Sequence, residues 1–196
     1  MPTKKGPPFI FQLKITLLGI EPPIWRRIHV PSAIPLCCLH NVFQAVMGWT
    51  DSHLHQFEKD GKSWGIPQYF EDEDLDVVDE GGVPLGKVLH AEGDSLLYVY
   101  DFGDNWRHAV VLESIVASDT ASNRPVCLAG ERRCPPEDVG GVPGYEQFLE
   151  VIFDPGHEEF EHFVGWAGGP FHAEHFDVMA VNDILFRMRW PVRHRR

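Results

Sequence analysis

The sequence predicts an α+β fold, in which a largely antiparallel sheet has helices packed on one face and a helix-rich C-terminal part. Two observations predict it. Strand-like alternation of apolar and polar residues dominates the first half of the chain, and apolar residues at helical spacing dominate the second half. With 196 residues, 43% of them hydrophobic, we expect one domain spanning residues 1–196.

The first third predicts two strands and a helix. Apolar residues occupy the odd positions of residues 9–17, which is the period of a half-buried strand. "IWRRIHV" predicts a second strand, because the prolines before it exclude a helix. From Leu36 onward the apolar residues recur at helical spacing, and Gly48 is suited to end that helix.

The middle of the chain predicts two hairpins and an acidic loop. Asp60-Gly61 is typical of a tight hairpin turn. Residues 71–80, "EDEDLDVVDE", hold seven acids in ten positions, and we expect a solvated loop because like charges repel. A short helix is predicted over residues 85–90, and residues 96–100 and 106–117 form the arms of the second hairpin.

The last third predicts a long loop followed by helices. The segment "CLAGERRCPPEDVGGVPGY" is rich in Gly and Pro, and helical spacing resumes near Tyr145. The N–H groups at the start of that helix could receive an anion, or the glycines could form a plain turn. A final helix is predicted from Val178 until Pro191 stops it.

The net charge of -12 disfavours nonspecific binding to nucleic acid or to an anionic membrane, since both attract clustered Lys and Arg. The basic tail "RMRWPVRHRR" could contact phosphate or be a solvated end. No run approaches the ~18 apolar residues of a membrane span, and the start shows no signal peptide. We therefore expect a cytoplasmic protein without a membrane partner.

One hairpin, "YVYDFGDNWRHAVVLE", concentrates polar chemistry at its bend. Its candidate binding residues are Asp101, Asp104, Asn105, Trp106 and His108. In a structural interpretation, the acids bond the N–H groups of the loop and His108 is a core residue. In a functional interpretation, a carboxylate orients the imidazole in a polar pocket, for metal binding or acid–base chemistry.

Histidines and cysteines elsewhere could complete a divalent-metal site, for instance for zinc. His53 and His55 alternate along an extended run and could both reach one ion. Cys127 and Cys134 lie outside the spacing of zinc knuckles, although the loop between them could bring them together. Alternatively, Cys127 is a buried strand residue and Cys134 begins a rigid turn. The metal candidates are thus His53, His55, His108, Cys127 and Cys134.

Four segments carry a resemblance to a known family: "PPIWRRIHVP", "LHNVFQAVMGWTDSHLHQF", "YDFGDNWRH" and "CLAGERRCPPEDVGGVPGY". In order and spacing the chain resembles the plasmid pRiA4b ORF-3-like family, also labelled passenger TnpR-type proteins of insertion elements. The resemblance implies residence on plasmids or transposons and, by its label, site-specific recombination. A serine recombinase needs a nucleophilic Ser beside an Arg cluster and a basic helix-turn-helix. The sequence shows neither.

The sequence therefore predicts a mobile-element-associated binding or interaction module. Its polar pocket would be built from the Asp101 to His108 loop and from parts of "DSHLHQF" and "CPPEDVGG". The alternative is a metal-dependent hydrolase or nuclease that uses the same Asp and His residues, which requires a bound divalent ion.

Overall fold

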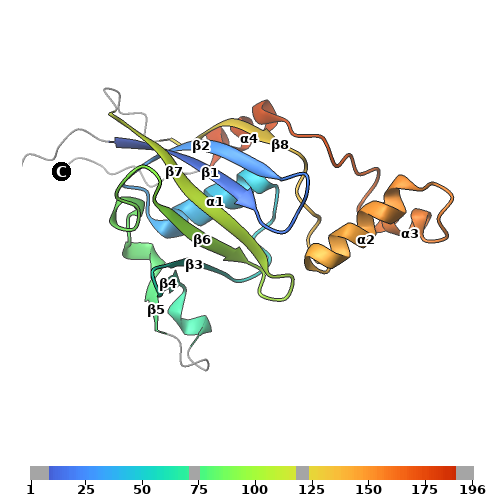
Figure 1. The fold of residues 1–196 in the computed structure, drawn as a ribbon, viewed down its shortest axis with the longest axis horizontal. Coiled ribbons are helices and arrows are strands. Elements are labelled where there is room, and N and C mark those ends of the chain that lie inside the picture. Colours follow the sequence, from blue (N-terminus) through green and yellow to red (C-terminus); the bar gives the residue numbers. More distant parts are fainter. Residues whose placement is uncertain (1–8, 71–75, 118–123, 189–196) are drawn as a thin grey trace, which may run out of the picture.

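Eight strands form one sheet in the computed structural model, which describes residues 9–70, 76–117 and 124–188 (Figure 1). Their order across the sheet is β5-β4-β3-β6-β7-β1-β2-β8, and every neighbouring pair is antiparallel except β4 and β5. This confirms the α+β class. The strands are β1 (Phe9–Leu17), β2 (Trp25–Pro31), β3 (His55–Lys59), β4 (Lys62–Gly65), β5 (Val77–Asp79), β6 (Ser95–Tyr100), β7 (Trp106–Ala117) and β8 (Val126–Glu131).

Three of the four α-helices in the described ranges follow residue 140, which confirms the predicted helix-rich C-terminal part. The helix α1 packs on the sheet, where the ring of Phe43 meets that of Tyr98 in β6 with centroids 5.0 Å apart. Beside α1 and β8 lies α4, whereas α2 and α3 project beyond the end of the sheet (Figure 1). The helices are α1 (Leu36–Met47), α2 (Gly141–Phe153), α3 (Phe160–Trp166) and α4 (Val178–Arg187), with short 3-10 turns at Pro67–Tyr69, Glu80–Gly82 and Leu85–Lys87.

The central strands show why one face of the sheet is apolar. In β1 the side chains of Leu13 and Ile15 are fully buried, and Lys14 between them is half-buried on the other face. β1 pairs with β7, which pairs with β6, so the first strand and both arms of the polar hairpin share one antiparallel sheet, as predicted. The other face carries polar contacts, such as the pair between Arg27 and Glu113 at 2.6 Å.

Three local expectations were wrong. The segment from Cys127 that was expected to be a long loop begins within β8. Val77 and Glu80 of the acidic run are buried rather than solvated, Val77 within β5 and Glu80 because its carboxylate binds a histidine. The helix expected near Tyr145 already begins at Gly141, since Pro143 is tolerated in a first helical turn. Residues 71–75 of the acidic run and the basic tail from residue 189 lie outside the described residues.

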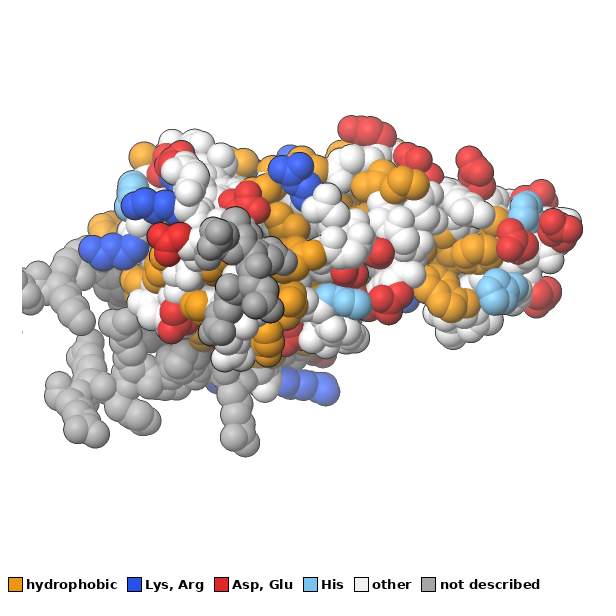
Figure 2. All heavy atoms as spheres, turned by 90° about the horizontal axis from the view of Figure 1, so that it is seen from below, with side chains coloured by type: hydrophobic (Ala, Val, Ile, Leu, Met, Phe, Trp, Pro, Cys, Tyr) orange, Lys and Arg blue, Asp and Glu red, His pale blue; other side chains and the backbone are white. Residues whose placement is uncertain are grey.

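The projecting α2–α3 end is acidic. Residues 141–166 contain no Lys or Arg, and Figure 2 shows carboxylates and histidines at this end among hydrophobic side chains. Such a surface repels phosphate, in agreement with the net charge. Within the described ranges, no helix has the length and apolar character needed to span a bilayer.

Candidate functional site

Asp101 lies at the bend after β6 and shapes the loop that follows it. Its φ of 56° is in the left-handed region, which Asp tolerates better than most residues. Its Oδ1 accepts hydrogen bonds from the N–H groups of Gly103 (2.9 Å) and Asp104 (3.3 Å). The N–H of Asp101 donates to the carbonyl oxygen of Leu54 at 2.8 Å, which ties this loop to the segment before β3. The side chain is 8% exposed, and Oδ2 accepts no hydrogen bond within the described chain.

The loop before α2 docks against the same bend. The N–H of Gly140 donates to Oδ2 of Asp104 at 3.1 Å, so this carboxylate occupies the N-terminal end of α2. A Cβ on Gly141 would lie 2.6 Å from the carbonyl oxygen of Asp104, and its φ is +68°. Only glycine allows so close an approach. The two loops therefore meet, and this brings Glu137 and Asp138 close to Asp101.

Hydrogen bonds orient Glu137 mainly through one of its oxygens. Oε1 accepts from the N–H of Thr50 at 2.8 Å and from the hydroxyl of Tyr100 at 3.1 Å. The other oxygen, Oε2, lies 3.3 Å from the same hydroxyl and 3.9 Å from Nε2 of His53. Partners of this kind commonly hold a metal-ligating carboxylate in place.

His53 lies among these carboxylates. Its Nε2 is 3.1 Å from Oδ1 of Asp138 and 3.6 Å from Oδ2 of Asp101, in addition to its approach to Glu137. This nitrogen is shielded from solvent, yet it makes no hydrogen bond. At 3.1 Å, the absence of a hydrogen bond means that the oxygen lies off the N–H direction. We call His53, Asp101, Glu137 and Asp138 the carboxylate–imidazole cluster.

His108 lies elsewhere, in the core. Its Nδ1–H donates to the carbonyl oxygen of Tyr98 at 3.1 Å, and its ring meets Trp49 edge-on with centroids 5.2 Å apart. No hydrogen bond or ion pair in the described chain joins it to Asp101 or Asp104. Burial lowers the pKa of His108 to about 4, so it is neutral at pH 7. The structure thus does not bring His108 to the two acids.

The remaining residues of the hairpin bend support the loop. Asn105 has a φ of 55°, and its N–H donates to the carbonyl oxygen of Asp101 at 2.6 Å. Trp106 is fully buried and lies close to the ring of Trp49, with centroids 6.2 Å apart. Neither side chain approaches the carboxylate–imidazole cluster through a described hydrogen bond.

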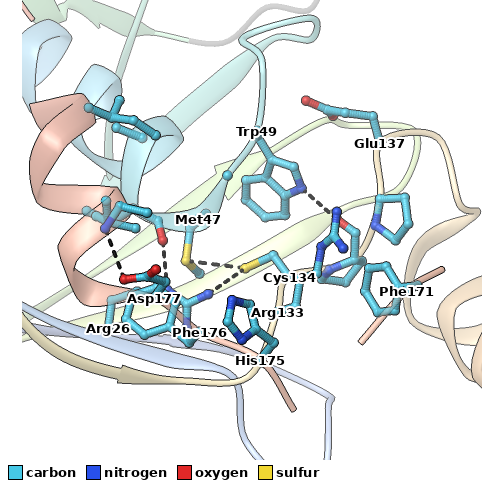
Figure 3. A pocket seen from close by; sticks show the side chains of 18 of the residues that line it. Arg26, Met47, Trp49, Arg133, Cys134, Glu137, Phe171, His175, Phe176 and Asp177 are labelled. Atoms are coloured by element: carbon cyan, nitrogen blue, oxygen red, sulfur yellow. Dashed lines mark hydrogen bonds between the residues drawn. The ribbon is translucent and has the colours of Figure 1, made fainter. Parts of the chain in front are cut away.

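The two candidate cysteines do not meet. The thiol of Cys127 donates to the carbonyl oxygen of Ala129 at 3.7 Å. The sulfur of Cys134 lies 3.6 Å from Sδ of Met47 and 3.6 Å from the guanidinium of Arg26 (Figure 3). Burial raises the pKa of Cys134 to about 11, so it stays a thiol. Neither cysteine joins a group of three metal-ligand side chains within the described residues.

Arg26 borders a hollow of 440 Å³ between the end of α1 and the segment before α4 (Figure 3). It is 1% exposed, and burial lowers the pKa of its guanidinium. All five of its N–H donors are used within the chain, so none is free for an anionic ligand. The acceptors are the carbonyl oxygens of Trp25, Val46, Glu131 and Arg132 and the sulfur of Cys134.

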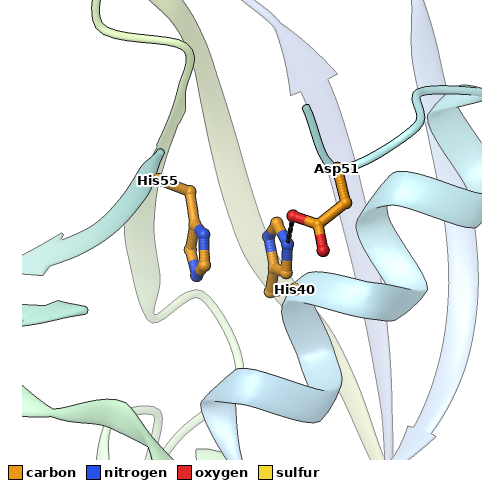
Figure 4. A group of neighbouring side chains, drawn as sticks. All are labelled: His40, Asp51 and His55. Atoms are coloured by element: carbon orange, nitrogen blue, oxygen red, sulfur yellow. Dashed lines mark hydrogen bonds and ion pairs between the residues drawn. The ribbon is translucent and has the colours of Figure 1, made fainter. Parts of the chain in front are cut away.

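A second histidine group lies close by (Figure 4). His40 of α1, Asp51 and His55 offer ligand atoms within 4.8 Å of one another. The two imidazole rings are stacked, however, with centroids 3.5 Å and planes 8° apart. An ion binds the in-plane lone pair of a ring nitrogen, so two parallel rings at this separation cannot share one ion without turning. This geometry disfavours a metal here. It also separates His55 from His53, which the sequence placed on one face.

A closed ring of hydrogen bonds holds His40. Asp51 accepts from its Nε2–H at 2.8 Å, so Nδ1 must accept, and the hydroxyl of Tyr98 donates to it at 2.8 Å. Gln44 closes the ring, since it donates to that hydroxyl at 3.2 Å and accepts from the N–H of Asp51 at 2.8 Å. Burial, assisted by His55, lowers the pKa of His40 to about 4. His40 is therefore a neutral imidazole of defined tautomer.

Sequence reasoning included the segments of three of these residues in the pocket without naming the residues. Glu137 and Asp138 lie within "CPPEDVGG", and Asp51 lies within "DSHLHQF". His40, within "LHNVFQAVMGWTDSHLHQF", was not predicted. These segments carry the family resemblance, which is the one signal that could have found them. Glu80 lies in the acidic run and had no such signal.

The same segments fall within the part of the chain that matches known proteins. The family model described as "Plasmid pRiA4b ORF-3-like protein" matches residues 9–180. The chain belongs to the pRiA4b ORF-3-like family. It is 36% identical over 193 residues to the uncharacterized protein y4hQ of Sinorhizobium fredii (strain NBRC 101917 / NGR234), which covers 95% of this chain and 97% of that protein.

A crystal structure has the same fold. It is that of a protein of unknown function, MM3350 from Methanosarcina mazei Go1, with a TM-score of 0.81 and 40% identity, and the match covers 90% of this chain and 98% of that one. The names of these relatives state no activity. Any chemistry of this pRiA4b ORF-3-like protein therefore has to follow from its own side chains.

Proposed function

We propose that this protein is a binding module for a divalent metal ion, which the carboxylate–imidazole cluster holds. One observation carries the proposal. The Nε2 atom of His53 is shielded from solvent, lies within 3.9 Å of three carboxylates and makes a hydrogen bond to none of them. A histidine that served only in ion pairs would be expected to direct its N–H at one oxygen.

The distances suit ligands arranged around an ion. Ligands at about 2.1 Å from a metal stand roughly 3.0 Å apart in octahedral and about 3.4 Å apart in tetrahedral geometry. The approaches of His53 to Asp138 and Asp101, 3.1 and 3.6 Å, are close to these values. Glu137, at 3.9 Å, needs a small shift. Oxygens placed in this way lie beside the nitrogen lone pair and not along it, which also accounts for the missing hydrogen bonds.

The donor set indicates the kind of ion. One imidazole nitrogen and three carboxylates favour a first-row divalent ion such as Mn²⁺ or Zn²⁺ over a soft ion, which would prefer thiolates. The three carboxylates gather negative charge around one point, and a divalent cation offsets it. Buried Asp101 and half-buried Glu137 each have one oxygen near His53 while backbone N–H groups hold the other. The ligands are thus largely preorganised.

Metal titration tests the proposal. The purified protein is stripped with a chelator and titrated with Mn²⁺ and with Zn²⁺ in a calorimeter. We expect one site per chain, and we expect His53→Ala to weaken it at least about tenfold. His162→Ala is the matched control, because His162 is exposed on α3. Equal affinity in the His53→Ala variant would refute the proposal.

A metal-dependent hydrolase is the second candidate, and the exposure of Asp138 favours it. Its side chain is 70% exposed, so solvent reaches the cluster from that side and a water molecule could occupy one ligand position. Hydrolysis of bis-p-nitrophenyl phosphate by the Mn²⁺-loaded protein is the test. If the parent protein hydrolyses this substrate no faster than the His53→Ala variant does, hydrolysis is excluded and metal binding remains as the proposed function. We further propose that the protein is encoded on mobile DNA, as the family description suggests. Identifying plasmid or transposon genes next to its own gene tests this.

A further inference from the structure

A hollow of 530 Å³ opens beside the stacked histidines, and His53 of the cluster is also one of its lining residues. Buried His55 and Glu80 line it together with Asp51. Apolar and aromatic side chains that are partly exposed form its rim, namely Leu54, Ile66 and Tyr69. We call it the acceptor-lined hollow.

Two carboxylate oxygens in this hollow have no hydrogen-bond partner among the described residues. Oε2 of Glu80 accepts from Nε2 of His55 at 2.9 Å, and the other oxygen of Glu80 is unbonded. Oδ2 of Asp51 is also unbonded, whereas Oδ1 is held by His40. Glu80 is 3% exposed, and its free oxygen is not enclosed in protein. The two free oxygens therefore face the hollow that Glu80 and Asp51 line.

Among the described residues, two carboxylates line the hollow and no Lys or Arg does. The described side-chain partner of buried Glu80 is the imidazole of His55. A cationic ligand would add charge and donors to this buried carboxylate. Aromatic Tyr69 and Phe70 add surfaces that favour a cation with an apolar body.

We propose that the acceptor-lined hollow binds a small organic cation, a primary ammonium or guanidinium on an aliphatic chain. The charged group would donate to the free oxygens of Glu80 and Asp51, and the chain would lie along the apolar rim. Hydrogen-bond geometry supports this ligand over a metal ion, because the stacked rings of His40 and His55 cannot both direct a lone pair at one ion. His53 of the carboxylate–imidazole cluster also lines this hollow, but the side chains proposed to hold the cation are not ligands of the proposed metal site, so the proposal does not depend on a bound metal.

Agmatine, which carries both cationic groups, is the probe. Its binding is measured by calorimetry in about 0.15 M salt, which screens weak attraction to the acidic surface. We expect saturable binding, at least tenfold tighter than that of butyrate, which has a similar aliphatic chain and the opposite charge. Binding of butyrate as tight as that of agmatine, or no saturation up to about 20 mM agmatine, would overturn the proposal.

Two variants locate the site. Glu80→Gln should weaken agmatine binding at least tenfold, whereas Glu158→Gln, an exposed control on the acidic end, should change it less than twofold. Should Glu80→Gln fail to fold, Asp51→Asn replaces it, since Asn keeps an oxygen for the ring of His40. Chelator-treated protein should bind agmatine unchanged, so failure of the metal proposal leaves this one standing. Unaltered agmatine binding in both Glu80→Gln and Asp51→Asn would overturn it.

Discussion

Asp101 divides its two carboxylate oxygens between the backbone and His53. Oδ1 accepts the N–H groups of its own loop, and Oδ2 lies 3.6 Å from Nε2 of His53. One acid therefore both builds the bend and completes the cluster. The structural and the functional interpretation of the "DFGDN" bend thus both apply to Asp101. A substitution that keeps the loop hydrogen bonds but removes the charge facing His53 can separate the two roles.

Asp101→Asn should weaken Mn²⁺ binding about tenfold or more without unfolding the chain. Asn keeps an oxygen for the loop N–H groups and tolerates the φ of 56°, but it removes the charge that faces His53. Calorimetric titration of the variant measures this. The control is Asp104→Asn, which should change affinity less than about threefold, because Asp104 bonds Gly140 and not the cluster. Equal losses in the two variants would count against the assigned ligand set.

Gly141→Ala should lower the free energy of unfolding by roughly 1–3 kcal/mol. The added Cβ would lie 2.6 Å from the carbonyl oxygen of Asp104, and an alanine backbone is strained at a φ of +68°. Because the loops would separate, Mn²⁺ affinity should fall as well. Urea unfolding provides the first value. Gly165→Ala in α3 has open space around its Cβ and should stabilise by about 0.5–1 kcal/mol. A Gly141→Ala variant as stable as the parent would show that the close approach of the loops is not required.

Acidification should destabilise the fold through His108. Its pKa is about 4 in the folded protein and about 6.5 when unfolded, so the unfolded state binds the proton more readily. The stability associated with neutral His108 is present above pH 6.5 and is lost as the pH falls towards 4. The loss from this one residue between pH 7 and pH 5 should be about 2 kcal/mol. Urea unfolding at both values measures it.

Substitution isolates that contribution. His108→Leu should lose less stability between pH 7 and pH 5 than the parent protein, although it starts from a lower value because the bond to Tyr98 is gone. His162→Leu, at an exposed position, should keep the full pH dependence. The same loss in all three proteins would mean that other groups cause the acid sensitivity.

Arg26→Lys should cost about 3 kcal/mol or more of folding free energy. Lysine has three donors for the five bonds of a buried guanidinium, so it leaves carbonyl oxygens at the ends of α1 and β8 without a donor. Arg27→Lys on the neighbouring position is the control and should cost less than about 1 kcal/mol, since its pair with Glu113 is partly exposed. Thermal unfolding of both variants measures the difference. Similar costs would mean that the buried bonds of Arg26 add little.

Local pattern determined most of the strands and helices and their buried faces, but not β5, β8 or α3. The alternation in residues 9–17 specified which side of β1 faces the core, because side-chain direction in a strand has a period of two. Asp60-Gly61 specified the hairpin between β3 and β4, and Gly48 the end of α1, because each position requires a positive φ. These features depend on neighbours a few residues away, which a sequence displays directly.

Tertiary structure alone decided which polar groups meet. His53 and His55 are two residues apart, yet one faces Asp101 and Asp138 and the other faces Glu80 and His40. This divergence arises because His53 precedes β3, whereas the pairing of β3 with β6 holds His55 in the sheet.

The location of the His108 side chain in the core could not be predicted from local pattern either. Its residue type suits a site, but its strand lies in the middle of the sheet and Trp49 covers its ring. Glu137 and Asp138 reach His53 only because glycine at position 141 allows two loops distant in sequence to touch. The sequence by itself thus determined most of the elements and the residue types available at each bend. Which of them converge depends on strand order and loop docking, which follow from the packing of the whole chain.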